Sequence, residues 1–150
     1  MRSAARIGTH PIHPMLVPFP YACGVLSVVA DGYAAYTNGP HYAGYYLAAV
    51  GCVTALLAAI PGFIDLFGAI PAAHPARRVG WRHAILNLVA LGFFALSVAA
   101  RPEPAYTNYL AYGASFAGLL TIAVSGWLGG TLVYDHRVGV PEPGDGTPMR

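Results

Sequence analysis

Residues 42–70 read YAGYYLAAVGCVTALLAAIPGFIDLFGAI, and this stretch decides the fold class. It is apolar almost from end to end and contains one charged residue, Asp65. A helix of about 20 apolar residues crosses the hydrocarbon core of a bilayer, which is about 30 Å thick. The stretch therefore predicts a transmembrane helix.

Three further apolar stretches of similar length predict three more spans, over residues 15–36, 81–100 and 105–134. The connectors between them are short and contain Pro or Gly. The sequence therefore predicts an all-α fold, an integral membrane four-helix bundle that forms a single domain over residues 1–140. Residues 141–150 are rich in Pro and Gly and predict a flexible tail.

The first span has an alternative interpretation as a secretory signal peptide. Arg2 and Arg6 precede it, and Val28-Val29-Ala30 resembles a small-residue cleavage site. Pro18, Pro20 and the length of the apolar run favour a helix that stays in the mature protein.

The composition excludes several classes of protein. Hydrophobic residues make up 56% of the chain and charged residues 9%, against about 25% charged residues in soluble domains. The net charge of +2 is too small for a nucleic-acid-binding surface. Cys23 and Cys52 lie in apolar runs, so we expect free thiols rather than a disulfide.

The arginines predict the orientation of the bundle. Those that precede the first span, lie between the second and third, or follow the fourth are Arg2, Arg6, Arg77, Arg78, Arg82 and Arg137. The opposite side has only Arg101. Because cytoplasmic loops carry the excess of positive charge, we expect both termini on the cytoplasmic side of a bacterial inner membrane.

Each predicted helix has a face of small or polar residues at alternating spacings of three and four, as expected where helices pack closely in lipid. In the second span this face runs from Gly44 through Gly51 and Gly62 to Asp65. Related faces are His13 to Asp31, His83 and Asn87 to Ser97, and Ala114 to His136. Ionisable groups inside a membrane are costly and usually functional.

A proline interrupts the second span one turn before Asp65. Pro61 predicts a kink that turns the Leu57 carbonyl into the bundle, or alternatively a helix whose backbone is satisfied by its neighbours.

Most histidines fall on the predicted cytoplasmic side, together with Asp65 and Asp135. They are His10, His13, His74, His83 and His136. Imidazole binds divalent metals and haem iron, and carboxylates orient or supplement it. In the segment His10-Pro11-Ile12-His13-Pro14, we expect Pro14 at the first helical position, His13 as the cap and His10 on an extended lead-in.

Several familiar site patterns do not occur in the chain. There is no His-x-Glu, Cys-x-x-Cys or Cys-x-x-Cys-His, so zinc hydrolases and covalently attached haem receive no support. No catalytic constellation is identified, and whether the chain is an enzyme stays open.

Taken together, the motifs resemble the bacterial membrane family known as domain of unknown function 2231. The matching elements are residues 10–20, Asp31, residues 62–65 and 83–87, residues 126–134, His136 and residues 138–140. The resemblance implies a compact four-helix module that some relatives join to Rieske iron–sulfur or cytochrome c-like domains. It therefore implies redox work with such a partner protein, but no agreed catalytic residues.

The leading hypothesis is a small redox subunit, a b-type cytochrome-like module near the cytoplasmic leaflet. His83 is the expected axial ligand of haem b, with His13 or His136 as the other and with Asp65 and Asn87 as supporting partners. If a divalent metal ion is bound instead, its candidate ligands are His10, His13, His83 and His136. The apolar wall of a haem site would come from Phe19, Phe63, Phe67 and Leu86.

Two other classes stay open, as does assembly into a homo-oligomer. One is a cofactor-free structural or partner-binding membrane subunit. The other is a small ion or proton transporter that uses Asp31 and Asp65. Those two residues fall at opposite ends of the bundle, since a helix from His13 to Asp31 is about 27 Å long, and no inverted repeat is visible.

Overall fold

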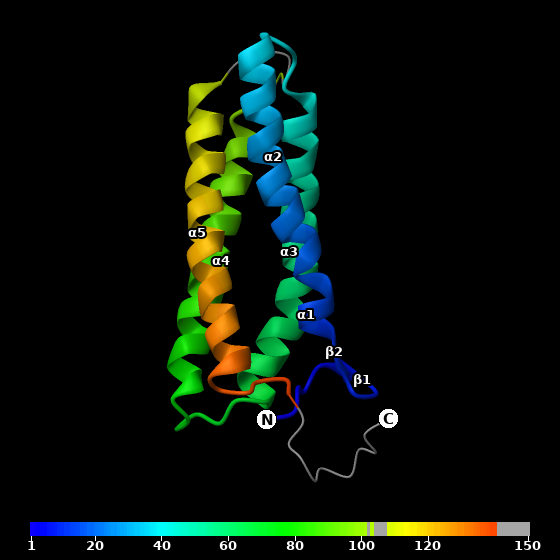
Figure 1. Cartoon of the computed structure of the whole chain (residues 1–150), viewed down its shortest axis with the longest axis vertical. Coiled ribbons are helices and arrows are strands. Elements are labelled where there is room, and N and C mark those ends of the chain that lie inside the picture. The colour runs from blue at the N-terminus through cyan, green and yellow to red at the C-terminus, as the bar shows by residue number, and fades with distance from the viewer. Residues whose placement is uncertain (102, 104–107, 141–150) are drawn as a thin grey trace.

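The computed structural model describes residues 1–101, 103 and 108–140, and its four long helices form an elongated bundle (Figure 1). The helices are α2 (Pro18–Thr37), α3 (Tyr42–Gly68), α4 (Ala76–Ala99) and α5 (Tyr109–Tyr134), with a short α1 (Ile12–Leu16) that precedes α2. Four segments, with α1 and α2 counted as one, are long and apolar enough to cross a membrane. The predicted all-α four-helix membrane fold is confirmed. The predicted tail, residues 141–150, lies outside the described residues.

The helix bounds differ from the predicted spans mainly where a helix begins or ends in polar sequence. Helix α4, the third predicted span, begins at Ala76 rather than at residue 81. Its first turn contains Arg77 and Arg78, which a search for apolar runs does not detect. Helix α3 ends at Gly68, and α5 begins at Tyr109, where the Asn108 side chain caps the helix by accepting from the Ala111 N–H. The predicted start of the fourth span, residues 105–107, lies outside the described residues.

The start of the chain and the segment after α5 lie together at one end of the bundle, here called the proximal end (Figure 1). There the Met1 ammonium donates to the Arg137 carbonyl at 3.1 Å, and the Gly139 N–H donates to the Met1 carbonyl at 2.9 Å. The opposite end, where α2 joins α3 and α4 joins α5, is called the distal end. Consecutive long helices are thus antiparallel.

The segment before the first helix folds back on itself. Strands β1 (Arg6–Ile7) and β2 (His10–Pro11) pair antiparallel, with Gly8 at φ +61° in the turn between them. His10 is therefore extended, as expected. The expected cap position of His13 is wrong: the helix begins at Ile12, and Pro11, at φ −69° and ψ 131°, is the cap. A proline fits there because its missing N–H would have no helical partner.

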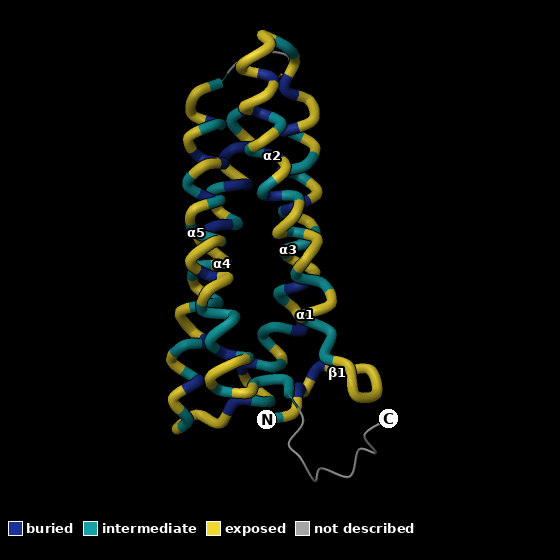
Figure 2. Tube along the Cα trace, viewed as in Figure 1, coloured by how far each residue is buried: buried dark blue, intermediate teal, exposed yellow. Residues whose placement is uncertain are grey.

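Buried residues lie on the sides of the helices that face one another, and exposed residues lie on the outer sides (Figure 2). The exposed residues include many large apolar ones. The predicted inward faces are largely correct. Their fully buried members include Gly24, Ser27, Asp31, Gly44, Ala48, Gly51, Ala58, Ala90, Phe94, Ser97, Ala114, Gly118, Ser125 and Leu132. The apolar core at the proximal end consists of Leu66, Ile70, Ala76 and Leu132, with Phe63 packed against it. The exposed apolar surface matches a bilayer environment.

The helices form two close pairs, α2 with α3 and α4 with α5. Contact between α2 and α5 is the least extensive of the four neighbour contacts in the bundle. Inward-facing residues of the α2–α3 pair therefore lie opposite inward-facing residues of the α4–α5 pair.

Candidate cofactor site

Two histidines from different helix pairs face each other in the proximal half of the bundle. His13 lies in α1 and His83 in α4, and their ring centroids are 6.2 Å apart with the ring planes at 84°. The structure therefore brings together two of the three predicted haem ligands.

Each of these imidazoles is held by a backbone carbonyl of an adjacent helix. Nδ1 of His13 lies 2.8 Å from the Ala58 carbonyl oxygen in α3, and Nδ1 of His83 lies 2.8 Å from the Ser125 carbonyl oxygen in α5. Because a carbonyl oxygen only accepts, the hydrogen-bond network assigns the ring proton to Nδ1 in both residues. Nε2 therefore carries the lone pair, which is the form of imidazole that binds a metal.

Glycines allow the rings to lie this close to the neighbouring backbones. A Cβ atom on Gly62 would lie 3.0 Å from Cε1 and Nδ1 of His13, and a Cβ on Gly129 would lie 3.2 Å from Cε1 of His83. Any larger residue at either position would press on the imidazole. Each histidine thus has both a hydrogen-bond acceptor and a shallow recess on the opposing helix.

Pro61, inside α3, does not provide the carbonyl for the bundle interior that the sequence predicted. Pro61 leaves the Leu57 carbonyl without its helical donor, but the carbonyl that binds His13 is that of the next residue, Ala58. The reason is direction: the Leu57 side chain is exposed, whereas Ala58 lies on the buried face of α3.

Asn87 accompanies His83, as its position one turn further along the same helix face predicts. Its Nδ2 donates to Nε2 and to the backbone carbonyl of His83, both at 3.0 Å. Within the described residues, Nε2 of His13 has no hydrogen bond. Nε2 of His83 thus accepts a hydrogen bond from the Asn87 amide, whereas the lone pair on Nε2 of His13 is available.

The remaining predicted site residues lie elsewhere. Asp65 accepts hydrogen bonds from the N-terminal segment, from the Ser3 hydroxyl at 2.8 Å and from the Ala4 and Ala5 N–H groups at 2.7 and 2.9 Å. His136 packs against His74, with ring centroids 6.0 Å apart. These contacts tie the proximal loops together.

No group of three or more His, Cys, Asp or Glu side chains with metal-binding geometry is found among residues 1–101, 103 and 108–140. His10, His13, His83 and His136 thus do not form one cluster. Of the expected apolar wall, Phe63 packs into the proximal core, whereas Phe19 and Phe67 are largely exposed.

The family described as a predicted membrane protein, DUF2231, matches residues 9–142. The chain belongs to this family. The match confirms the resemblance found in the sequence. No curated protein and no solved structure matches the chain significantly.

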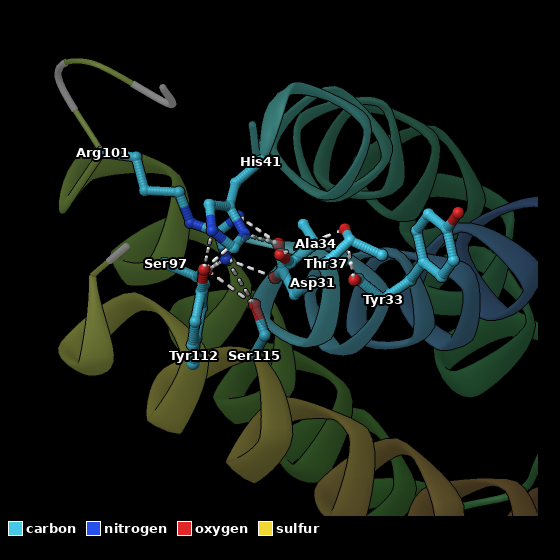
Figure 3. A network of polar contacts seen from close by, with 9 residues as sticks. All are labelled: Asp31, Tyr33, Ala34, Thr37, His41, Ser97, Arg101, Tyr112 and Ser115. Carbon is cyan, nitrogen blue, oxygen red and sulfur yellow. Dashed lines mark hydrogen bonds and ion pairs between the residues drawn. The ribbon is translucent and has the colours of Figure 1, made fainter. Parts of the chain in front are cut away.

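A second polar cluster in this DUF2231 chain lies at the distal end, and the sequence did not predict it (Figure 3). Asp31 of α2 and Arg101, just after α4, form a two-fold ion pair with distances of 2.8 and 2.6 Å. Nη2 of Arg101 also donates to the hydroxyl groups of Ser97, at 2.8 Å, and Ser115, at 3.3 Å. The two serine hydroxyls are 2.6 Å apart.

His41 and Tyr112 complete this distal cluster. The Tyr112 hydroxyl is hydrogen-bonded to the His41 ring, and Nδ1 of His41 lies 3.8 Å from the Asp31 carboxylate. The Arg101 guanidinium lies over the Tyr112 ring, 5.4 Å from its centroid. The cluster therefore links α2, α4, α5 and the α2–α3 connection.

The sequence did contain a signal for the ion pair. Asp31 ends the inward face of the first span, Arg101 is the only arginine on the same side, and Ser97 lies four residues before it. Opposite charges at the same depth on neighbouring helices of a membrane bundle are expected to pair.

Proposed function

We propose that the chain is a small membrane redox module that holds haem b between His13 and His83. The observation that supports it is the facing pair of Nδ1-protonated imidazoles. Two imidazoles that held one metal ion between them on opposite sides, each with a nitrogen about 2.0–2.1 Å from it, would have their ring centres about 6 Å apart. The separation of 6.2 Å fits this arrangement.

A haem needs fewer protein ligands than a bare metal ion. The porphyrin itself supplies ligands to the iron, so haem would need only His13 and His83 from the protein. A pair without a third protein ligand among the described residues would therefore be sufficient for haem and is sparse for a structural divalent ion. When bound, haem supplies one-electron transfer.

The chain's own groups have defined tasks in this proposal. The carbonyls of Ala58 and Ser125 accept hydrogen bonds from the Nδ1–H groups of His13 and His83 and would hold the two rings in position. The Ser125 hydroxyl also lies 3.0 Å from Nδ1 of His83. Nε2 of His83 would be the nitrogen that holds the haem, and in the structure the Asn87 amide donates to this nitrogen.

Inward-facing Ala55, Gly62, Thr121 and Gly129 are half-buried at the level of the two histidines, and Asn87 is exposed. Further toward the distal end, the Phe94 ring lies against Gly24 and Gly118. In this proposal the flat cofactor would lie against the half-buried positions.

Visible absorption spectra of the detergent-purified chain, oxidised and then reduced with dithionite, test the proposal. We expect a haem spectrum that changes on reduction and is lost in His83→Ala and in His13→Ala. The matched control is His136→Ala, which removes an imidazole that packs against His74 instead and should leave the spectrum unchanged. If the wild type shows no haem after production with ample haem supply and after addition of haemin, the proposal is wrong.

One observation favours a second candidate, a cofactor-free structural or partner-binding subunit. Asn87 and Ser125 already provide His83 with partners on both ring nitrogens, as a helix clamp would. This function predicts a colourless wild type and a less stable His83→Ala variant, because a buried partner is left unsatisfied at a cost of about 1–3 kcal/mol. Elemental analysis of the same purified sample tests whether a divalent metal ion is bound instead of haem.

The cellular setting follows from the redox proposal. A bilayer-embedded module of this size would exchange electrons with an iron–sulfur or cytochrome c-like protein in a bacterial inner membrane. Co-purification of the chain with such a partner would support this part of the proposal. The His83→Ala variant should lose the partner only if it also loses haem.

A further inference from the structure

The distal ion pair is unusual because both charges are almost completely buried. Asp31 and Arg101 are each 3% exposed. A buried ion pair contributes little net stability, and apolar side chains of similar size often serve the fold equally well. Ionisable groups at such depth in a membrane bundle commonly mark a binding site.

Arg101 is the main hydrogen-bond donor of the distal cluster. Both carboxylate oxygens of Asp31 and both serine hydroxyls accept from the Arg101 guanidinium. Nε of Arg101 has no acceptor among the described residues. Ser97 and Ser115 need only one hydroxyl hydrogen for the bond between them, so the other hydrogen remains available to an additional acceptor.

A pocket of about 170 Å³ adjoins this cluster between α2 and α5, the neighbouring helices with the least contact. Its polar end is formed by Asp31, Ser115 and Tyr112, and its walls are apolar, formed largely by Val28, Ala35 and Phe116. Figure 3 shows the Ser115 and Tyr112 side chains reaching the cluster from α5. An apolar pocket with a few polar groups at one end is the usual form of a small-molecule site.

We propose that this distal pocket binds the carbonyl oxygen of a neutral, lipid-soluble molecule. The spare hydroxyl hydrogen calls for an acceptor, and the charges of Asp31 and Arg101 cancel, so a neutral group suits the site better than an ion. Two membrane components have this chemistry, an isoprenoid quinone and the ester group of a phospholipid. The inference does not rest on the haem proposal, because His13 and Asp31 are about 27 Å apart along the helix.

Gly32 makes a sharp test possible. It lines the pocket, and a Cβ at this position would meet nothing within 4 Å, so we expect Gly32→Leu to be accepted and to take up part of the pocket. Gly92→Leu in α4 is the matched control, since a Cβ there also meets nothing within 4 Å. Gly92 does not line the pocket. Equal thermal unfolding of both variants and the wild type checks that they fold.

The full chain is assayed in detergent with two probes. Titration calorimetry measures binding of a naphthoquinone with a short isoprenoid tail, and native mass spectrometry measures retention of phosphatidylethanolamine. We expect at least one probe to bind the wild type and Gly92→Leu equally, and to bind Gly32→Leu tenfold or more weakly. The probe that responds identifies the source of the carbonyl group.

The hydrogen-bond donor is tested separately. Ser115→Ala removes the hydroxyl and should weaken the responding probe several-fold, whereas Ser115→Thr retains the hydroxyl and should restore binding. The proposal is overturned if neither probe binds, if Gly32→Leu and Gly92→Leu bind equally well, or if Ser115→Ala binds as tightly as the wild type.

Discussion

The imidazoles of His13 and His83 are positioned by backbone rather than by other side chains. Each donates from Nδ1 to a carbonyl on an adjacent helix and lies against a glycine of that same helix. The position of each ring is therefore sensitive to a single added methyl group at Gly62 or Gly129.

Gly62→Ala should displace His13. The new Cβ would lie 3.0 Å from the ring, so the imidazole must move and its 2.8 Å hydrogen bond to Ala58 must lengthen. Overpacking of this kind costs about 1–3 kcal/mol. Replacing a helical glycine by alanine gains about 1 kcal/mol. We expect the cost to exceed the gain, because the packed ring cannot move freely. We expect a lower thermal midpoint in detergent, together with loss of any bound haem.

Gly92→Ala is the control for that variant. Open space surrounds the added methyl group, so only the gain in helix propensity remains and the midpoint should stay the same or rise. If the two alanine variants were equally stable and equally competent to bind haem, the proposed recess for His13 would have no role.

The sequence could predict which site residues share a face only within a helix, where the spacing of residues defines the direction of each side chain. His83, Asn87 and Ser97 lie within one helix, and their shared face followed from the spacing. His136 lies beyond Tyr134, the last residue of α5, where the spacing no longer applies, and it packs against His74. Arg101 also lies beyond its helix, but its long side chain reaches back to Asp31.

At the scale of elements, the side chain of Arg77 fastens the connection between α3 and α4 to the end of α3. The last carbonyls of a helix lack helical donors, and Nη1 of Arg77 donates to the carbonyls of Leu66 and Ile70, the latter at 2.7 Å. The Arg77 guanidinium also lies 5.1 Å from the centre of the Phe67 ring.

Arg77→Ala should lower the free energy of unfolding by about 1.5–3 kcal/mol, the usual range for hydrogen bonds to a charged group. Arg78→Ala is the control, because no side-chain hydrogen bond of Arg78 is found within the described part of the chain. Unfolding by denaturant in mixed micelles measures both variants. An equally small effect in both would show that the connection is held by apolar packing alone.

The distal ion pair joins α2 to the end of α4, and a double-mutant cycle measures its contribution. Asp31→Leu or Arg101→Met alone leaves one buried charge without its partner, which costs about 3–5 kcal/mol. The double variant Asp31→Leu with Arg101→Met removes both charges and should recover most of that stability. A double variant as unstable as the single ones would mean that the cluster is needed for packing.

At the scale of the whole molecule, the four apolar runs were enough to predict the fold. Lipid requires every backbone polar group of a span to be satisfied within the span, so length and composition leave few alternatives to helices. The polar first turn of α4 and the hairpin of β1 and β2 could not be predicted in this way, because packing at the proximal end determines them.

The predicted orientation, with both termini cytoplasmic, stays a prediction that rests on the arginines. Arg101, the only arginine assigned to the distal side, is paired with Asp31 and buried. The other described arginines precede α1, lie in or near the first turns of α4, or follow α5, all at the proximal end. A reporter active only in the cytoplasm should function when fused after Arg150 and fail when inserted at Asn38, the exposed residue at the end of α2. Arg101→Met should leave this pattern unchanged, because it removes the one distal arginine and the proximal side keeps the excess of positive charge. Activity at Asn38 combined with silence after Arg150 would reverse the orientation and place His13 and His83 nearer the outer leaflet.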